Sequence, residues 1–583
     1  MEKKTTSIFD KFKKCLDYQV GKGLQKKWIE LVDFVEGNQW APATEKTKYM
    51  PRPVINQCDF IIENKKSNIL SQNLKMVFNP AELDADKADE LIKAADEYTN
   101  AAESTWYDID QNTLNEKVVD DVLVLGTGVF HYYFDNSLTG GQFTPYIGKL
   151  RGQAIDPIDI GLGNPHLYDY ETQKQPWIII RSYPDIEEVK KKVKENGGNP
   201  EDIQLEESST DEKYTDAQID IKDTSKITLY TEYFKKNKEV WWRQATKDVV
   251  VTKEQTLAPE GSKKQFTLYP IEILTFKTRR KCTFGRSVIE DIIPSQRALN
   301  WQMGMMLLSI QQTAWPKLIA KLGALNQAVT NEPGEILIDH YGAAGVEGIK
   351  FMQPPNFTQM PMILTEKMLD MIRQTTGTTE VTSGEVLGAN MAAAAIIALQ
   401  NQAKKPNELF QNKFYKSMKN NGRIWEQFYK IFYNTPKPIQ YFDISGKNQN
   451  GVFDGSKNAD VELGLKVNIG PTSVFGEELQ MTVLDGMADR GWIDKYAYSR
   501  YSPNNIVPAE MKHDFAKEEE ILKQQQQMTS QMPQQQPQGQ SQQQMQPDMA
   551  TIMSKLSPEE QAILDSNPQL IDEVFKGGGA NGL

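Results

Sequence analysis

The spacing of apolar residues predicts long helices near the beginning of the chain and again in its second half. Apolar side chains three or four residues apart are typical of amphipathic helices. This spacing predicts one or two helices over residues 5–35 and further helices over 54–73, 81–124, 294–314, 360–375 and 391–433. Gly37 ends the first stretch, and Gly126 and Gly128 follow the third. Pro406 should kink the last helix, because a proline inside a helix removes a backbone donor and collides with the preceding turn.

The middle third of the chain changes to a strand pattern. Short runs rich in β-branched and aromatic residues are separated by turn residues, which is typical of a β-rich domain. One helix is expected within it, at 185–196, and β structure is expected again at 335–339 and 436–469. The strands expected in the domain are residues 129–134, 177–182, 227–234, 239–243, 248–253 and 271–276. The predicted fold class is therefore α+β, mainly helical with one β-rich domain.

Several segments follow neither pattern. Residues 201–220 hold eight acidic residues and one lysine, and we expect a solvated loop because these carboxylates lack the spacing of a metal-ligand set. Residues 375–390 are rich in Thr, Ser and Gly and predict a mobile loop. A helical region is expected at 477–523. Residues 524–547 contain 14 glutamines and predict a disordered tether, with a short helix after it at 557–575.

Composition narrows the class of protein. A chain of 583 residues predicts roughly three to four domains. Its 66 basic and 78 acidic residues give a net charge of −12, which argues against tight, sequence-independent nucleic-acid binding because that needs clustered cations. Three widely spaced cysteines cannot form a disulfide framework and suggest a reducing compartment. No signal peptide and no run of about 18 apolar residues occurs, so we expect an intracellular protein without a membrane span.

The motifs of common enzymes are missing from the sequence. It has no phosphate-binding P-loop, no GxSxG elbow and no HExxH zinc helix. Gly126-Thr127-Gly128 follows a helix and precedes a strand, the reverse of the dinucleotide-binding order, so a turn is the better interpretation. The neighbouring carboxylates of Asp120 and Asp121 are expected to be exposed helix charges. We therefore predict no catalytic, cofactor-binding or metal-ligating residue and no enzymatic activity, although metal ligands drawn from distant segments stay open.

Five short motifs, in order, resemble one family. They are GNQW at 37–40, RPVIN at 52–56, VLGTGVF at 124–130, IDP at 155–157 and GRSVIEDIIPSQRALN at 285–300. Together with the helix, insert, helix, loop and long helix that follow, this order resembles the portal proteins of tailed bacteriophages, of the short-tailed phage type. The resemblance covers residues 37–433. It assigns family-motif structural roles to Trp40, Asn56, Gly126, Gly128, Pro157, Gly285, Pro294, Gln296 and Asn300.

The resemblance implies a ring of twelve subunits at one vertex of the capsid, through which DNA is packaged and later ejected. Twelve copies at −12 would give the ring a formal charge of −144. The resemblance also divides the chain. The parts are a wing at 1–285, a first stem helix at 286–315, a clip at 316–359, a second stem helix at 360–375, a tunnel loop at 376–390, a kinked tunnel helix at 391–434, wing return strands at 435–476, a crown at 477–523 and the tether with its short C-terminal helix at 524–583.

Candidate sites follow from these parts. The tunnel loop would present small polar side chains to DNA, and the sparse cations beside it would touch phosphates weakly enough to let DNA slide. The expected channel residues are Thr382, Ser383, Glu385, Asn390, Lys404 and Lys405. The expected partner-docking residues of the clip are Asn331, Glu332, Asp339, His340 and Tyr341. A long C-terminal helical barrel, present in some short-tailed relatives, is not expected, because the tether takes its place.

The partners implied are further copies of the chain, the major capsid protein and scaffold, the terminase large subunit, the head-to-tail adaptor or tail proteins, and double-stranded DNA. The location implied is the portal vertex of the virion, after synthesis in the cytoplasm of the bacterial host. The apolar positions of 294–314 surround that helix and predict burial on several sides, against neighbouring copies or in a monomer core. The alternatives are another phage connector or ring protein and, as an enzyme, a metal-dependent nucleic-acid enzyme with dispersed acidic ligands.

Overall fold

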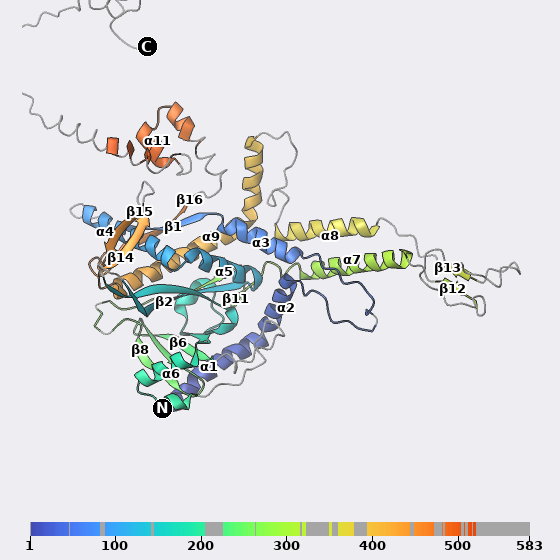
Figure 1. Cartoon of the computed structure of the whole chain (residues 1–583), viewed down its shortest axis with the longest axis horizontal. Coiled ribbons are helices and arrows are strands. Elements are labelled where there is room, and N and C mark those ends of the chain that lie inside the picture. The colour runs from blue at the N-terminus through green and yellow to red at the C-terminus, as the bar shows by residue number, and fades with distance from the viewer. Residues whose placement is uncertain are drawn as a thin grey trace, which may run out of the picture. The chain divides into compact units, whose positions relative to one another are not determined.

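The computed structural model divides the chain into two units, Met1–His513 and Asp514–Leu583. The architecture below is that of the first unit (Figure 1). The structure describes residues 2–519 apart from 46, 82–87, 141–144, 204–225, 260, 263, 315–317, 322–348, 352–359, 378–392, 443–447, 471–480, 482–483, 503–506, 508–510, 513 and 516.

Five helices occupy the N-terminal part of the first unit. Gly37, in the left-handed region at φ 91°, ends the second of them as expected. The single helix expected at 81–124 is instead two helices, because Asp110 takes a left-handed conformation (φ 51°) and its carboxylate accepts the backbone N–H of Thr113. The five are α1 (Glu2–Gly21), α2 (Leu24–Glu36), α3 (Gln57–Leu70), α4 (Ala88–Asp108) and α5 (Gln111–Val124).

One strand interrupts these helices. The expected helix at 54–73 ends earlier, at Leu70, and β1 (Asn73–Pro80) begins immediately afterwards. β1 pairs antiparallel with β16 (Leu463–Gly470), and the register runs from Asn73 opposite Gly470 to Pro80 opposite Leu463. The pairing therefore joins the N-terminal helical part of the chain to a strand close to residue 470.

The β-rich domain is confirmed as two sheets. A five-stranded antiparallel sheet has the order β4-β5-β6-β7-β8, and a three-stranded sheet has the order β3-β2-β9. The strand expected at 177–182 has those bounds, and α6 (Ile186–Glu195) lies within the expected 185–196. The strands are β2 (Thr127–Gly140), β3 (Tyr146–Ile155), β4 (Ile160–Leu162), β5 (Trp177–Ser182), β6 (Leu229–Lys236), β7 (Glu239–Ala245), β8 (Val250–Thr256) and β9 (Ile271–Thr275).

A pair of helices extends from this body. α7 (Ile293–Ala314) and α8 (Met360–Thr376) lie side by side (Figure 1), and the amide of Gln302 on α7 donates to the Pro361 carbonyl on α8 at 2.5 Å. Between them β12 (Leu318–Ala320) pairs antiparallel with β13 (Ile349–Phe351). The strand expected at 335–339 lies outside the described residues.

The longest helix, α9 (Ala393–Phe432), contains Pro406, and its ribbon bends in Figure 1. Its second half lies in the main hydrophobic core, as the apolar stripe of this segment predicts. The buried side chains of the stripe are Phe410, Phe414, Met418, Trp425 and Phe428. After α9 come β14 (Lys437–Phe442), β15 (Asn448–Phe453) and β16, as the β pattern at 436–469 predicts, and later α11 (Lys495–Tyr501). The fold is therefore α+β.

Candidate functional site

The structure brings most of the motif residues together at two junctions next to the N-terminal end of α7. The first, here called the glycine junction, consists of Gly126, Thr127, Gly128, Gly285 and Ser287. It joins the end of α5 and the start of β2 to the hairpin of β10 (Lys277–Arg279) and β11 (Cys282–Arg286). This hairpin leads directly into α7.

Close backbone contact explains the three glycines of the junction. A Cβ atom on Gly128 would lie 2.4 Å from the carbonyl oxygen of Val118, and one on Gly285 would lie 2.4 Å from the carbonyl oxygen of Gly126. Gly126 itself has φ 84°, where side chains are strained, and its Cβ would lie 2.6 Å from the carbonyl carbon of Arg286. These glycines therefore serve a turn and tight packing, as the order of helix and strand predicts.

Hydrogen bonds lock the glycine junction. The backbone N–H of Gly285 donates to Oγ1 of Thr127 at 2.8 Å, and Oγ of Ser287 donates to the carbonyl of Leu123 at 2.7 Å. Both bonds are buried, so losing either partner would leave a polar group without water or protein to bind. The segment that starts α7 is thus fixed to the end of α5.

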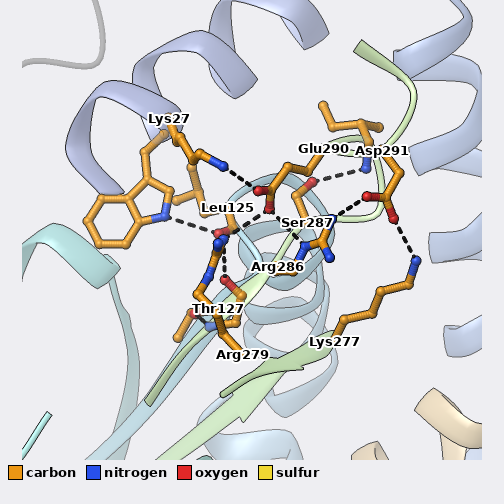
Figure 2. A network of polar contacts seen from close by, with 12 residues as sticks. Lys27, Leu125, Thr127, Lys277, Arg279, Arg286, Ser287, Glu290 and Asp291 are labelled. Carbon is orange, nitrogen blue, oxygen red and sulfur yellow. Dashed lines mark hydrogen bonds and ion pairs between the residues drawn. The ribbon is translucent and has the colours of Figure 1, made fainter. Parts of the chain in front are cut away.

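A network of ion pairs covers the same junction (Figure 2). The carboxylate of Glu290 accepts hydrogen bonds from Lys27 of α2 at 2.6 Å and from Arg279 at 3.0 Å. Asp291 forms an ion pair with Lys277 at 3.1 Å. Burial raises the pKa of Glu290, but the hydrogen bond from Lys27 and the nearby arginines outweigh it, so the pKa lies below its ordinary value. The carboxylate therefore stays charged near neutral pH, which holds α2, the hairpin and the start of α7 together.

The second junction, here called the amide junction, is a buried chain of side-chain amides. Asn300 donates to Gln39 at 2.6 Å, and Gln39 donates to Asn56 at 2.9 Å. Gln296 donates to the carbonyl of Ile55 at 2.6 Å and to Oδ1 of Asn300 at 3.0 Å. The motif residues Asn56, Gln296 and Asn300, far apart in sequence, thus meet at one place. Their bonds join the segment before α3 to α7.

Aromatic and small residues extend the amide junction along α7. The indole N–H of Trp40 donates to the carbonyl of Pro53 at 3.0 Å, and its ring lies 6.2 Å from the ring of Trp301. A Cβ atom on Gly304 would lie 2.7 Å from the carbonyl oxygen of Pro51. The segment between α2 and α3 therefore packs directly against the backbone of α7.

The two remaining motif prolines lie where helices begin. Pro294 is the second residue of α7, where the missing N–H has no intrahelical acceptor to lose. Pro157 opens a 3-10 turn, η1 (Pro157–Asp159), capped by the carboxylate of Asp156. Pro157 lies apart from both junctions, although its carbonyl accepts the buried amide of Gln19 at 3.4 Å.

The expected channel and clip residues are only partly described. Thr382, Ser383, Glu385 and Asn390 of the loop lie outside the described residues, as do Asn331, Glu332, Asp339, His340 and Tyr341 of the clip. Lys404 belongs to the described backbone of α9, and Lys405 is exposed. The roles of these residues stay predictions.

The joint between α8 and α9 is described. Gly377 follows α8 at φ 69°, and a Cβ atom there would lie 2.8 Å from Cβ of Pro406 in α9. Next to this proline, Oδ1 of Asn407 accepts a hydrogen bond from Nζ of the buried Lys65 of α3 at 2.7 Å. Burial, with a contribution from Lys277, lowers the pKa of Lys65 to about 8. α9 is therefore fixed to α3 beside its internal proline.

The structure also shows a surface that sequence periodicity could not assign. Apolar side chains of α7 and α8 are exposed rather than buried in the described part of the chain. On α7 they include Trp301, Met305, Leu307 and Ile310, and on α8 Met360, Met362, Ile363, Leu364 and Met371. A monomer core therefore does not account for these positions. The distribution of apolar residues around α7 was the signal that such a surface existed.

One carboxylate differs from its expected environment. Asp121 was expected to be an exposed helix charge, but it is half-buried, and burial together with Asp156 and Asp120 raises its pKa to about 8.

Among the described residues, no group of three or more His, Cys, Asp and Glu side chains is placed to hold a metal ion. Within the same residues, no helix has the length and apolar character needed to cross a membrane.

Comparison with known families agrees with the architecture. A family model described as phage P22-like portal protein matches residues 10–454, a span that contains both junctions, the β-rich domain and α7 to α9. Portal proteins are a structural class rather than a class of enzymes. The chain belongs to the phage P22-like portal protein family, and the resemblance found in its motifs is confirmed. No curated protein matches the sequence at a significant level.

Proposed function

We propose that this portal protein forms a ring of twelve copies at one capsid vertex, and that DNA enters and leaves the capsid through the ring. In this proposal α7 and α8 are the stem helices, 316–359 is the clip, 376–390 is the tunnel loop, 391–434 is the tunnel helix and 477–523 is the crown. Residues 1–285 and 435–476 form the wing, and 524–583 are the tether with its short C-terminal helix. The ring nucleates capsid assembly, docks the terminase during packaging and then holds the tail adaptor.

The exposed apolar surface of α7 and α8 is the observation that supports this proposal most strongly. Ile310, for example, is 54% exposed although it lies in a helix of largely apolar character. Large exposed apolar patches mark surfaces that bind other proteins, and a ring would cover this one with a neighbouring copy at every position. Removing apolar area from water contributes about 25 cal/mol per Å², from which the entropy lost on association is subtracted.

The charge of the chain suits a conduit. A net charge of −12 per copy keeps phosphate from binding tightly to the ring as a whole, so DNA can move without being held. Lys404 and Lys405, next to the proposed tunnel loop, would supply the few attractive contacts. Crosslinking the loop residues Thr382 or Ser383 to DNA in filled particles would support this passage, and failure to crosslink any loop residue would count against it.

A pair of matched variants tests the ring. Ile310→Glu places a charge on the exposed apolar face of α7, and Gln311→Glu places the same charge on the next exposed residue, which is polar already. We expect Ile310→Glu to abolish or strongly weaken ring formation in sedimentation experiments, and Gln311→Glu to assemble like the parent protein. Equal assembly of both variants would contradict the proposed role of this face.

Docking of packaging partners to the clip rests on the family alone and needs a separate test. We expect deletion of residues 331–341, which include His340 and Tyr341, to leave ring formation intact and to block packaging and tail attachment. A deleted protein that still packaged DNA and attached tails would refute the clip assignment without refuting the ring.

A further inference from the structure

The solvent face of α9 carries a row of cations. Lys416, Lys419 and Arg423 are exposed and fall on one side of α9, a helix with 3.6 residues per turn. They span roughly 10 Å at 1.5 Å per residue. None of the three forms an ion pair with a carboxylate of the described chain, so their positive charge stays available to a partner. We call this row the cationic face.

Two exposed apolar or aromatic residues accompany the cationic face. Leu409, about two helical turns before Lys416 and on the same side of α9, is 81% exposed. Tyr170, from the 3-10 turn η2 (Asp169–Lys174), is 64% exposed, and Nζ of Lys416 lies 5.8 Å from its ring centroid. An exposed aromatic ring beside the cations favours a protein partner, because aromatic residues are enriched in protein interfaces.

A complementary acidic face lies on α3 and α5. Glu63, Glu116 and Asp120 surround Lys66 at 2.5, 3.9 and 3.5 Å, and Asp59 is exposed one turn before Glu63. Three carboxylates thus share one ammonium group and Asp59 adds a fourth negative charge nearby, which leaves an excess of negative charge. The side chains of Glu63 and Glu116 are more than half exposed.

The two faces point away from a shared core in opposite directions. Trp425 packs edge-on against Tyr132 of β2 at 5.7 Å, and it lies on the opposite side of α9 from the cationic face. The hydroxyl of Tyr132 donates to the buried Gln111 of α5 at 3.2 Å, and Asp120 lies on the opposite side of α5 from Gln111. The acidic and cationic faces are therefore on opposite sides of the protein between α5 and α9.

We propose that the cationic face of one copy docks on the acidic face of the next copy, so that the contact is head-to-tail. This inference rests on the proposed ring and assigns one of its interfaces. Complementary surfaces on opposite sides of one chain are what a closed ring of identical subunits requires. DNA is a poorer occupant of the cationic face, because phosphates would leave the exposed side chain of Leu409 uncovered and the acidic face without a partner.

Charge reversal on each face tests the docking. The first variant is Lys416→Glu with Lys419→Glu and Arg423→Glu, and the second is Glu63→Lys with Glu116→Lys and Asp120→Lys. In the first variant both faces are then negatively charged, and in the second both are positively charged. We expect each alone to raise the protein concentration at half assembly at least tenfold, measured by sedimentation at low salt.

Mixing the two variants supplies the decisive measurement. In an equimolar mixture the acidic α9 of the first can dock on the basic α3–α5 face of the second, and the reverse contact forms as well. We expect mixed rings with alternating subunits, detected by native mass spectrometry. The matched control, Lys191→Glu with Lys194→Glu and Lys253→Glu, reverses three exposed lysines of α6 and β8 and should assemble like the parent. Tryptophan fluorescence of every variant checks that it folds.

The outcomes separate this interface from the ring itself. The docking is refuted, and the ring stands, if the parent forms rings and both reversed variants assemble like the control. The same conclusion follows if mixing the two reversed variants does not restore ring assembly. Should the first variant form normal rings and lose only packaged DNA, the cationic face contacts DNA instead and the docking is again refuted. If the parent never forms rings, even with capsid and scaffold proteins, the proposed function fails first.

Discussion

Gly128 offers the sharpest test of why the glycine junction has its sequence. An alanine there would place its Cβ 2.4 Å from the carbonyl oxygen of Val118 and 2.8 Å from a methyl carbon of both Val118 and Val122. Inserting a methyl group into a filled core costs about 1 to 3 kcal/mol. Because the nearest atom is backbone and cannot rotate away, we expect Gly128→Ala to destabilise the protein by about 3 kcal/mol, the upper part of that range.

Urea unfolding followed by tryptophan fluorescence measures this effect at the junction itself. The buried indole of Trp28 donates to the carbonyl of Leu125 at 3.1 Å, two residues before Thr127. With a slope of about 3 kcal/mol per M, a loss of about 3 kcal/mol lowers the urea midpoint by roughly 1 M.

A second strand glycine is the matched control for Gly128. Gly464 lies in β16, and a Cβ atom there would meet nothing nearer than the carbonyl oxygen of Asn79 at 3.5 Å, an ordinary contact. Gly464→Ala should therefore change stability by less than about 1 kcal/mol. Adding Val118→Ala to Gly128→Ala should restore little, because the carbonyl oxygen remains. Equal midpoints for Gly128→Ala and Gly464→Ala would refute the steric explanation of the motif.

Further predictions concern buried polar groups. Asn300→Ala leaves Oε1 of Gln39 without its 2.6 Å donor, and we expect a loss of about 1 to 3 kcal/mol in the free energy of unfolding, measured in urea; an unchanged midpoint would show that the amide junction is dispensable. Burial raises the pKa of Glu272 to about 8, so its folded form keeps a proton that the unfolded chain releases near pH 4.5. Its contribution to stability therefore falls as the pH rises from about 4.5 to 8. Glu272→Gln should remove this loss of stability with pH. If the free energy of unfolding of parent and variant changed with pH in the same way, the raised pKa would be contradicted.

Local pattern predicted the elements that carry a strong period. The apolar stripe of α9 predicted its burial, because Phe410, Phe414 and Trp425 repeat with the helical turn and fill the core. The strand at 177–182 was predicted with correct bounds because three isoleucines follow one another between turn residues. In these segments local propensity and tertiary packing favour the same structure.

The misses arose where tertiary partners decide the structure. The strand Asn73–Pro80 is stabilised by pairing with Leu463–Gly470, a partner nearly 400 residues later in the chain, and its own pattern resembles the end of the preceding helix. The break between α4 and α5 depends on one residue, Asp110, in a left-handed conformation. Short strands such as β10 carry charged residues and lack the apolar alternation that marks a strand.

The sequence predicted which residues belong to the candidate site, but not how they are arranged in space. Asn56, Gln296 and Asn300 were singled out by resemblance, and only the structure shows that Gln39 links Asn300 to Asn56. Lys65 carried no signal at all, because a buried lysine beside Pro406 looks like any other lysine in a helix. Contacts between distant segments depend on the whole fold, which periodicity does not encode.

The mass of the purified protein tests the central claim most directly. A ring of twelve copies of 66.3 kDa has a mass of about 796 kDa by light scattering, and negative-stain images of the same fraction should show a central hole at least as wide as duplex DNA, roughly 20 Å. That result would support the proposed channel. A protein that stays a monomer or dimer, both alone and with capsid and scaffold proteins present, would contradict it.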